Sequence, residues 1–414
     1  MRKRAVSVLL INQYFWPDVA ATAQLLAELA EDLAAGGARV TVLAGRGSYL
    51  ADKAGKLPRR EQWRGVEVRR LRCTSFGRGS LIGRLTDYLT FLVTAKVAVL
   101  FGPRHDVVIC LSTPPLVAGL GLVARLRGAG FVYKVEDLYP DVAIMLGALR
   151  AGSAVSRMVA WFSRFLLRRA NTVVALDEAM ADTLERRGAK TVEVIPNWAD
   201  GRAIRPDAEA GSRFRREHDL EGRFVVLYSG NLGLAHTFTA VTEAARNLAT
   251  LEPQLLFLFV GGGPRLHEVR TATDGLENVR FMPYQPRELL RGLFNAADVH
   301  LVTLRDEVAG MVVPSKYRAA LAAGKPVLLV GGRGTEMRTE IEREGIGWNC
   351  DQDAGRVRAV LLHACRHPEV LVEMRGRARY LLERKYERRL CTRKWADLLS
   401  QVLNSGQGTD LAHA

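Results

Sequence analysis

Short runs of apolar residues, rich in Val, Ile and Leu, recur along the chain between stretches with the spacing of amphipathic helices. In the first half, this pattern predicts strands at Val6–Ile11, Val40–Ala44, Val107–Leu111, Phe131–Val135, Thr172–Ala175 and Val192–Ile195. In the second half, it predicts strands at Phe224–Ser229, Leu255–Val260, Val279–Met282, Val299–Val302 and Pro326–Val330. Apolar strands that alternate with helices are typical of a parallel sheet covered on both faces. We therefore predict an α/β protein with two doubly wound, Rossmann-like domains.

The boundary between the two domains is predicted from a change in pattern. The segment "PNWADGRAIRPDAEAGSRFRREHDLEGR" contains proline, glycine and mixed charge without a sustained apolar period. We therefore predict a first domain at residues 1–200, a linker at 201–222 and a second domain at 223–390. Residues 356–403 read as helices only, and residues 391–414 as a C-terminal helix with a tail that is disordered from Asn404 on.

Length and composition agree with a globular protein of two domains. The chain has 414 residues, of which 48% are hydrophobic and 25% charged. Its five cysteines are far apart and include no C-x-x-C pair, which argues against a disulfide framework and favours a reducing cytoplasm. The N-terminal "MRKRAVSVLLINQYF" is too short in apolar residues for a signal peptide, and no uncharged run of 18 apolar residues occurs. We expect a cytoplasmic protein.

The net charge of +15 is concentrated in the first half of the chain. Residues 1–200 contain 28 Lys and Arg against 18 Asp and Glu, which is a difference of +10. Such a surface suits an anionic partner, which could be a phosphorylated substrate, an acidic lipid or nucleic acid. A merely soluble, arginine-rich surface explains the charge about as well.

The loops after the strands of the second domain carry the residues best suited to a ligand, because open parallel sheets bind ligands beyond the carboxyl ends of their strands. Gly230 and Gly233 follow one strand, and Gly261–Gly263 follow the next. Glycine lets the backbone approach a ligand, and the amides of a following helix suit a phosphate. Each glycine alone could simply form a turn.

The stretch "VVPSKYRAALAAGKPVLLVGG" adds a cation to these loops. Pro314 fits the first turn of a helix, Ser315 can satisfy an unpaired helix amide, and Lys316 adds a positive charge where the helix dipole is already positive. That charge is unfavourable without an anion, so we predict a nucleoside diphosphate next to Lys316. The alternative is a surface lysine that faces water.

Several other chemistries lack their sequence signatures. No phosphate loop of the Walker type, no complete dinucleotide fingerprint and no H-E-x-x-H metal site occurs. Asp351 and Asp353 have the D-x-D spacing found in metal-dependent sugar transferases, but their polar loop favours a turn and a helix cap. We expect no metal and no cofactor.

The chain resembles, over nearly its whole length, the retaining glycosyltransferases of family four, which have the GT-B fold. The resemblance rests on "NQYFWPDVAATAQLLAELAEDLAAGGARVTVLAG", "LSTPPL", "VEDLYPD", "VIPNWAD", "LYSGNLGLAHTF", "FVGGGP", "VRFMPYQPRELLRGLFNAADVHLV" and "VPSKYRAALAAGKPVL". The "STPPL", "EDLYPD" and "PSK" versions are most similar to the subgroup that builds O-antigen, colanic acid and other exopolysaccharides, including fucosaminyl transferase-like proteins. The resemblance implies two Rossmann-like domains facing a cleft, with the C-terminal helix returning to the first domain.

The resemblance also implies roles for individual residues. The second domain would bind a nucleotide-sugar donor through Gly230, Asn231, Gly233, His236, Gly262, Gly263, Tyr284, Gly310, Met311, Val312, Ser315 and Lys316. The first domain would bind the acceptor through Trp16, Pro17, Ala20 and Ala21. Catalytic carboxylates would be Glu136, Asp137 and Glu307, where Glu136 and Asp137 replace a His-Asp pair and could instead cap a helix.

The sequence departs from the family pattern in three respects. Ala20 and Ala21 replace a pair of glycines, and Asn231 and His236 replace an Arg and a Lys that often bind the diphosphate. The second Glu of an E-x7-E pattern, expected near Ala319, is absent, so Glu307 is the best remaining carboxylate for the donor sugar.

We therefore predict a retaining, metal-independent transferase that moves a hexosyl or N-acetylhexosaminyl group from a UDP-, GDP- or dTDP-sugar to a lipid-linked or growing glycan. Alternatives are a nucleotide-sugar 2-epimerase of the same fold and a non-catalytic, basic membrane-binding protein. The ten Lys and Arg between Lys53 and Arg84, and the helix "SRMVAWFSRFLLRRA", suggest peripheral docking on an anionic membrane at its inner face, and no nucleic-acid partner is expected. Packing of that helix on the sheet is the alternative.

Overall fold

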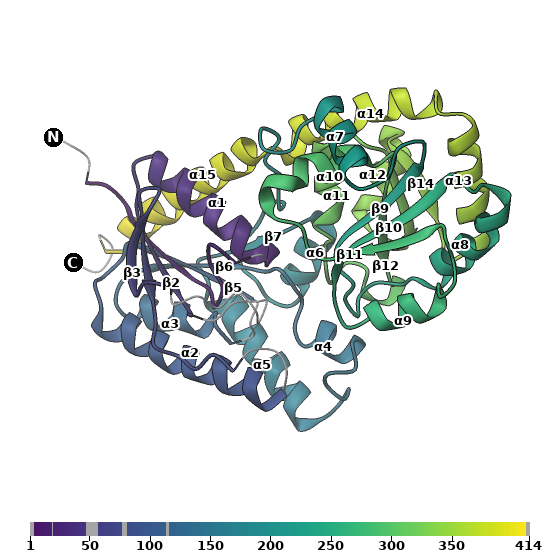
Figure 1. The fold of residues 1–414 in the computed structure, drawn as a ribbon. Coiled ribbons are helices and arrows are strands. Elements are labelled where there is room, and N and C mark those ends of the chain that lie inside the picture. The colour runs from purple at the N-terminus through teal and green to yellow at the C-terminus, as the bar shows by residue number, and fades with distance from the viewer. Residues whose placement is uncertain (1–3, 19, 47–56, 77–80, 113–115, 411–414) are drawn as a thin grey trace. The chain divides into compact units, whose positions relative to one another are not determined.

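The structure is a computed structural model that describes all residues except 1–3, 19, 47–56, 77–80, 113–115 and 411–414 (Figure 1). It divides into two compact units. Unit 1 comprises Met1–Asn197 and Arg389–Ala414, and unit 2 comprises Trp198–Arg388. The C-terminal segment therefore returns to the first domain, as the resemblance implies.

Unit 1 is built on a single sheet of eight strands. Their bounds are β1 (Ser7–Ile11), β2 (Arg39–Ala44), β3 (Arg60–Trp63), β4 (Val66–Arg70), β5 (Val107–Leu111), β6 (Gly130–Lys134), β7 (Thr172–Ala175) and β8 (Val192–Val194). The order is β3-β4-β2-β1-β5-β6-β7-β8, and all neighbours are parallel except β3 and β4. β1, β5 and β6 are buried almost throughout, which agrees with their continuous apolar sequences.

Helices cover both faces of this sheet. Their bounds are α1 (Ala21–Ala35), α2 (Leu81–Phe101), α3 (Gly119–Arg125), α4 (Asp141–Met145), α5 (Ala154–Arg169), α6 (Glu178–Arg186) and α15 (Arg388–Asp410). Figure 1 shows α1 and α15 on one side of the sheet, and α2, α3 and α5 on the other. α15 buries Cys391, Trp395, Leu398, Leu399 and Val402. It continues through Asn404 to Asp410, so the predicted disordered tail is helical over that part.

Unit 2 contains a second sheet of six strands, all parallel. Their bounds are β9 (Phe224–Asn231), β10 (Leu255–Gly262), β11 (Val279–Met282), β12 (Val299–Leu304), β13 (Val327–Gly331) and β14 (Gly347–Cys350). The order is β11-β10-β9-β12-β13-β14. Large side chains fill both faces, with Tyr228, Phe238, Phe257 and Phe259 on one and Phe214, Leu256, Leu258 and Leu293 on the other.

The helices of unit 2 connect and cover these strands. Their bounds are α7 (Ala208–Glu217), α8 (Thr239–Leu251), α9 (Leu266–Ala272), α10 (Leu290–Ala296), α11 (Lys316–Ala322), α12 (Glu336–Glu344), α13 (Ala354–Arg366) and α14 (Val370–Leu381). Two short 3-10 helices, η2 (Arg287–Leu289) and η3 (Asp306–Val308), and a π-helix, η4 (Leu382–Tyr386), complete the unit. Residues 354–403 are helical apart from short connections, as predicted.

The segment predicted as a linker, 201–222, differs from that expectation. Asp207 caps α7 by accepting a hydrogen bond from the Ala210 amide at 2.9 Å. Phe214 on α7 is buried and packs in the same core as Leu293 of α10. The segment is therefore part of unit 2, because one large apolar residue is enough to fix a short polar helix on a neighbouring helix.

Candidate functional site

The strand order of unit 2 places a topological switch point between β9 and β12. The chain runs from β9 outward to β10 and β11, and then returns to place β12 on the other side of β9. The loops after two such strands diverge and leave room for a ligand at the carboxyl edge of the sheet. The loop after β9 and the loop after β12 are also joined directly, since the Arg305 amide donates to the Ala235 carbonyl at 2.9 Å.

Three glycines allow the backbone of β9 and β10 to approach closely at this edge. Gly230, Gly261 and Gly263 have φ angles of +122°, +134° and +144°, which favour glycine. A Cβ at residue 261 would lie 2.2 Å from the Gly230 oxygen, and one at residue 263 would lie 2.4 Å from Asn231 Oδ1. These glycines are therefore required by the close packing of the two strand ends, and the approach of a ligand to them stays a prediction.

Lys316 reaches across from α11 to this glycine loop. Its Nζ donates to the Asn231 carbonyl at 3.2 Å, lies 3.2 Å from His236 Nε2, and sits 4.8 Å from the centre of the Tyr228 ring. The aliphatic part of Lys316 packs over Gly230, where a Cβ would lie 3.2 Å from Cε. The structure therefore brings Lys316 to Gly230, Asn231 and His236, which lie 80 or more residues earlier in the sequence.

His236 is held as a neutral imidazole. Its Nδ1 lies 2.5 Å from the Thr303 carbonyl oxygen, which can only accept, so Nδ1 carries the proton and Nε2 accepts from Lys316. Burial, together with the charge of Lys316, lowers the pKa of His236 to about 3.

Among the residues that the structure describes, the surroundings of Lys316 provide dipoles but no carboxylate. Its Nζ contacts a carbonyl, a neutral imidazole and an aromatic face, and burial lowers the pKa of Lys316 to about 7. An ammonium has three N–H donors, and the Asn231 and His236 contacts use two. A nearby anion would accept from the third and would raise the pKa again.

The other predicted donor residues occupy neighbouring loops. The Tyr284 hydroxyl points to the Gly262 carbonyl at 3.4 Å, and Gly233 packs against Asn231 and His236. Gly310, with a φ of +72°, begins the Gly310–Val312 segment that leads to α11. Ser315 differs from expectation: it precedes α11 in helical conformation and its side chain makes no capping hydrogen bond. Its backbone geometry does not direct the hydroxyl to the helix amides.

Glu307 lies in a polar pocket of about 300 Å³ next to the glycine loop. Arg265 and Arg305 line the same pocket, and Arg305 Nε lies 3.4 Å from Glu307 Oε2. Arg265 was not among the predicted site residues. It lies two residues after the predicted Gly261–Gly263 turn, so a basic residue just beyond a glycine-rich strand end was the available signal.

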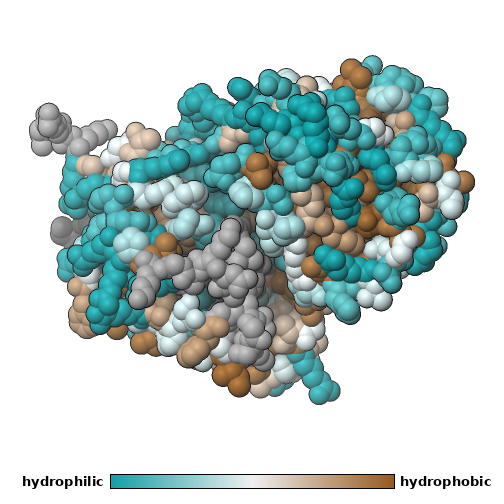
Figure 2. Space-filling view, viewed as in Figure 1, coloured by the Kyte–Doolittle hydropathy of each residue, from teal (hydrophilic) through white to brown (hydrophobic). Residues whose placement is uncertain are grey.

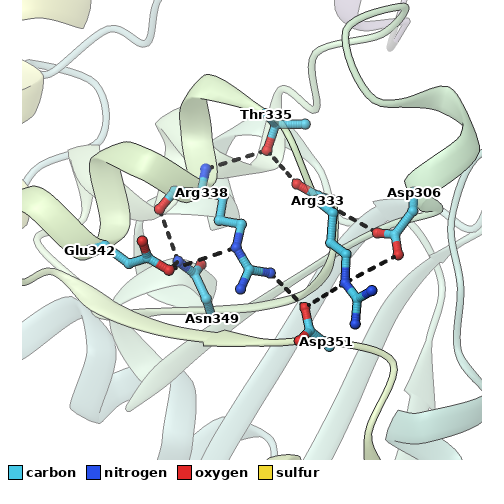
Figure 3. A network of polar contacts seen from close by, with 8 residues as sticks. Asp306, Arg333, Thr335, Arg338, Glu342, Asn349 and Asp351 are labelled. Carbon is cyan, nitrogen blue, oxygen red and sulfur yellow. Dashed lines mark hydrogen bonds and ion pairs between the residues drawn. The ribbon is translucent and has the colours of Figure 1, made fainter.

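A network of ion pairs fixes the loops that carry this pocket (Figure 3). Asp306, adjacent to Glu307, accepts from the Arg333 amide at 2.9 Å. Asp351 accepts from Arg333 Nε at 3.0 Å and from Arg338 Nη1 at 2.7 Å, and these two hydrogen bonds lower the pKa of Asp351 to about 2. The ends of β12, β13 and β14 are thereby tied together. Asp353 caps α13, as predicted, by accepting from the Gly355 and Arg356 amides.

In unit 1, the predicted carboxylate Glu136 is buried in a polar cluster. Both of its oxygens are engaged, one by Lys134 Nζ and the other by Asn197 Nδ2 at 2.9 Å. Lys134 Nζ also donates to Asn197 Oδ1 at 2.8 Å. Ser112 Oγ accepts from the amides of Glu136 and Asp137. Asp137 is the more exposed of the two carboxylates. Both carboxylate oxygens of Glu136 are therefore bound within unit 1, by contacts that the sequence pattern did not reveal.

The predicted acceptor residues form a well-braced loop after β1. The Trp16 ring stacks on Trp63 at 5.5 Å, and the Trp16 carbonyl accepts from Arg70 Nη2 at 2.7 Å. Pro17 and Ala21 are exposed, whereas Ala20 is buried at the start of α1.

The basic run Lys53–Arg84 is partly neutralised by acidic neighbours. Arg70 is buried against Glu61 at 2.7 Å, and Arg69 pairs with Glu67 at 2.6 Å. Lys53, Lys56, Arg78 and the side chain of Arg84 lie outside the described residues. The sequence count therefore overstates the free positive charge of this segment.

Two helices of unit 1 expose apolar side chains instead. On α2 these are Ile82, Leu85, Leu89, Val93, Val97, Leu100 and Phe101, and on α5 they are Val155, Met158 and Trp161. In Figure 2, apolar side chains gather along the lower edge of unit 1, where Figure 1 shows α2. None of the helices that the structure describes combines the length and the apolar character needed to cross a bilayer.

Comparison with known proteins identifies the class of enzyme to which this chain belongs. Residues 21–198 match the family described as glycosyl transferase 4-like domain, and residues 212–359 match glycosyl transferases group 1. This chain is a glycosyltransferase. Its two families meet near the unit boundary at Asn197 and Trp198, and its two parallel sheets give it the GT-B fold.

The proteins similar to this glycosyltransferase include one named for colanic acid biosynthesis and one solved in complex with UDP-glucose. WbjE of Pseudomonas aeruginosa, named as a glycosyltransferase, is 25% identical over 73% of this chain and 76% of its own length. WcaI of Escherichia coli strain K12, named for colanic acid biosynthesis, is 31% identical over 53% of this chain and 55% of its own length. The structure of Anabaena HepE in complex with UDP-glucose has a TM-score of 0.68 at 16% identity, covering 95% of this chain and 99% of HepE.

Proposed function

We propose that this glycosyltransferase moves a hexosyl or N-acetylhexosaminyl group from a nucleoside-diphosphate sugar to a lipid-linked or growing glycan, with retention of the anomeric configuration and without a metal. The observation that carries the proposal is the position of Lys316. Lys316 has one N–H donor left over and no carboxylate partner among the described residues, and it lies at a switch point lined by glycines. A diphosphate supplies the anion that this arrangement lacks.

Different residues of unit 2 would contact the diphosphate and the sugar of the donor. Lys316 would stabilise the charge that develops on the leaving diphosphate, and Gly230 and Gly261 would let the phosphate approach the backbone. Glu307, held beside Arg305 and braced by Asp306, would face the sugar hydroxyls. In unit 1, Asp137 would orient the acceptor hydroxyl, with the Lys134–Glu136 cluster as its support.

The name of WcaI supports a surface-polysaccharide pathway, and the UDP-glucose complex of HepE supports a nucleotide-sugar donor. The match to two glycosyltransferase families favours transfer over the epimerase and non-catalytic alternatives. The test is release of free nucleoside diphosphate that requires an acceptor glycan. Release without acceptor at the same rate would contradict transfer.

Retention and metal independence need separate measurements. Proton NMR of the product should show the same anomeric configuration as the donor, and activity should persist in EDTA. An inverted product, or loss of turnover in EDTA that Mg²⁺ restores, would contradict the respective part of the proposal.

We also propose that unit 1 docks on the anionic inner face of the cell membrane through the exposed apolar row on α2. A row spaced by three or four residues forms one face of a helix, as interfacial helices have. The net charge of +15 favours an acidic surface, where each nearby basic residue contributes about 1 kcal/mol. Co-sedimentation with acidic liposomes should fall as salt approaches ~0.5 M, because screening shortens the range of attraction. A double change, Leu89→Ser and Val93→Ser, should weaken it without affecting nucleotide binding.

A further inference from the structure

Two adjoining pockets lie on the outer side of α5, and neither belongs to the site described above. The first, which we call the arginine pocket, has a volume of about 350 Å³ and lies between α5, the start of α4 and the end of α6. The second, the aromatic groove, has a volume of about 440 Å³ and follows α5 itself. Ala160, Arg164 and Arg168 line both, so the two pockets form one continuous surface.

The arginine pocket has an excess of positive charge. Its lining contains four arginines, Arg164, Arg168, Arg186 and Arg187, against one acid, Asp141. Arg187 Nη1 already pairs with that acid at 2.8 Å. No hydrogen bond or ion pair joins the side chain of Arg164 or Arg168 to another residue that the structure describes. Guanidinium groups that converge in this way repel one another unless an anion lies between them.

The backbone holds one of these arginines in place. Arg168 lies against Gly188, whose φ is +98°, and a Cβ at residue 188 would be 3.0 Å from Arg168 Nε and 3.5 Å from its Cγ. A glycine at this position therefore lets the arginine lie flat along the pocket wall. The Arg186 guanidinium is oriented separately, by donating to Thr183 Oγ1 at 3.0 Å.

The aromatic groove provides a surface of opposite character beside the arginine pocket. The rings of Trp161 and Phe165 stack at 5.7 Å with an interplanar angle of 9°. The Trp161 side chain is 64% exposed, although indole is among the most costly side chains to leave in water. Arg157, Arg164 and Arg168 border this aromatic pair. A basic pocket continuous with an aromatic groove matches a molecule with an anionic head and an apolar chain.

We propose that this surface binds the phosphate group of a lipid, with the phosphate between Arg164, Arg168 and Arg186 and the start of the apolar chain along Trp161 and Phe165. The identification of the lipid as the carrier of the acceptor glycan rests on the proposed function. The phosphate site itself rests only on the geometry of α4, α5 and α6. Guanidinium pairs phosphate through two parallel hydrogen bonds, which a pocket of this composition can supply more than once.

Calorimetry with small probes tests the site directly. The probes are geranyl diphosphate, the uncharged alcohol geraniol, and inorganic pyrophosphate, each titrated into the full chain carrying Lys316→Ala so that the donor site contributes little. Geranyl diphosphate should bind, and R164A/R168A should weaken it by about a hundredfold or more, since each lost charge-assisted hydrogen bond accounts for roughly tenfold or more. R164K/R168K should recover part of the affinity, and the exposed Arg393→Ala on α15 should have no effect.

The probes separate the possible sources of the phosphate. Trp161→Ala should weaken geranyl diphosphate and leave pyrophosphate unchanged. If pyrophosphate bound as tightly as geranyl diphosphate and Trp161→Ala had no effect on either, the pocket would be a site for free phosphate. The assignment to a lipid phosphate would then be wrong. The phosphate site would be overturned if geraniol bound as tightly as geranyl diphosphate. It would also be overturned if R164A/R168A kept its thermal midpoint and bound geranyl diphosphate as tightly as the unmodified chain.

The binding test of the phosphate site does not depend on turnover, and transfer assays test the carrier assignment separately. If binding follows the expected pattern but no sugar transfer is found, the proposed function fails and the phosphate site stands. If R164A/R168A transfers sugar to a lipid-free acceptor at the normal rate but no longer to a lipid-linked acceptor, both the proposed function and the carrier assignment stand. If the variant uses both acceptors as the unmodified enzyme does, the carrier assignment is wrong.

Discussion

Each unit places a lysine near the carboxyl edge of its sheet, but the two lysines have opposite surroundings. Lys134 ends β6 and meets the Glu136 carboxylate and the Asn197 amide, so its charge is balanced within the protein. Lys316 meets a carbonyl, a neutral imidazole and an aromatic ring, so its charge is only partly stabilised. A buried cation with its own carboxylate contributes to structure, whereas one without a carboxylate is prepared for a ligand. Lys134 is also the more deeply buried of the two, since Lys316 is only half-buried.

The largest expected effect concerns the balanced lysine. Glu136→Gln should lower the free energy of unfolding of unit 1 by about 3 to 5 kcal/mol, because it leaves the Lys134 ammonium buried without its countercharge. Urea titration measures the loss. The double variant K134M/E136Q should recover much of it, since the uncompensated charge is removed as well. A loss below about 1 kcal/mol for Glu136→Gln would mean that the pair behaves like one at the surface.

The same kind of change at Lys316 should leave stability intact and affect binding. Lys316→Ala should weaken nucleotide-sugar binding roughly ten- to hundredfold, as expected for the loss of a charge-assisted hydrogen bond. Calorimetry measures the affinity, with the exposed Lys394→Ala as the matched control. Unchanged affinity would remove Lys316 from the donor site and end the contrast between the two lysines.

A pH series sharpens the contrast further. The pKa of Lys316 is about 7 in the free protein, and a bound diphosphate would raise it, so the protonated form is the one that binds. Affinity for a nucleotide-sugar should therefore be full below about pH 7 and fall by up to about tenfold per pH unit above it. His236, with a pKa of about 3, stays neutral throughout this range. Lys316→Arg should bind with little pH dependence, and a flat profile in the unmodified enzyme would contradict the assignment.

The smallest expected effect separates Ser315 from a true cap. Ser315→Ala should change the free energy of unfolding by no more than about 0.5 kcal/mol, because its side chain makes no capping hydrogen bond. Asp353→Ala, which removes two hydrogen bonds to the start of α13, should cost about 1 kcal/mol. Thermal unfolding of the two variants compares them. Equal losses would show that Ser315 caps α11 in solution.

Much of the fold could be predicted because its strands are continuously apolar. The predicted bounds of Val107–Leu111, Thr172–Ala175 and Val279–Met282 are those of β5, β7 and β11. β3 was missed because three of its four residues are polar, and β4 because it mixes charged residues with valines; both are weak signals next to the buried apolar runs. β14 was missed because an edge strand that begins with glycine lacks an apolar run.

The candidate site was predictable as a set of loops but not as a set of contacts. The doubly wound pattern places the loops after β9, β10 and β12 at one edge, so the glycines and Lys316 could be selected. The partnership of Lys316 with His236, the pairing of Glu136 with Lys134 and Asn197, and the pocket position of Arg265 depend on side-chain directions that no local pattern encodes. Residues that act through long-range contacts are therefore the ones that sequence reasoning missed.

The return of the C-terminal segment to unit 1 has a consequence for synthesis on the ribosome. Unit 2 is continuous in sequence, and its ends are joined, since the Ala199 amide donates to Tyr386 and the Arg388 amide donates back to Ala199, each at 3.1 Å. Unit 1 is complete only when Trp395 and Val402 of α15 reach its sheet, where Val402 packs against Gly130. Translation therefore finishes unit 2 first. The strands of unit 1 are synthesised earlier, but the unit stays open to chaperones and proteases until α15 has also been synthesised.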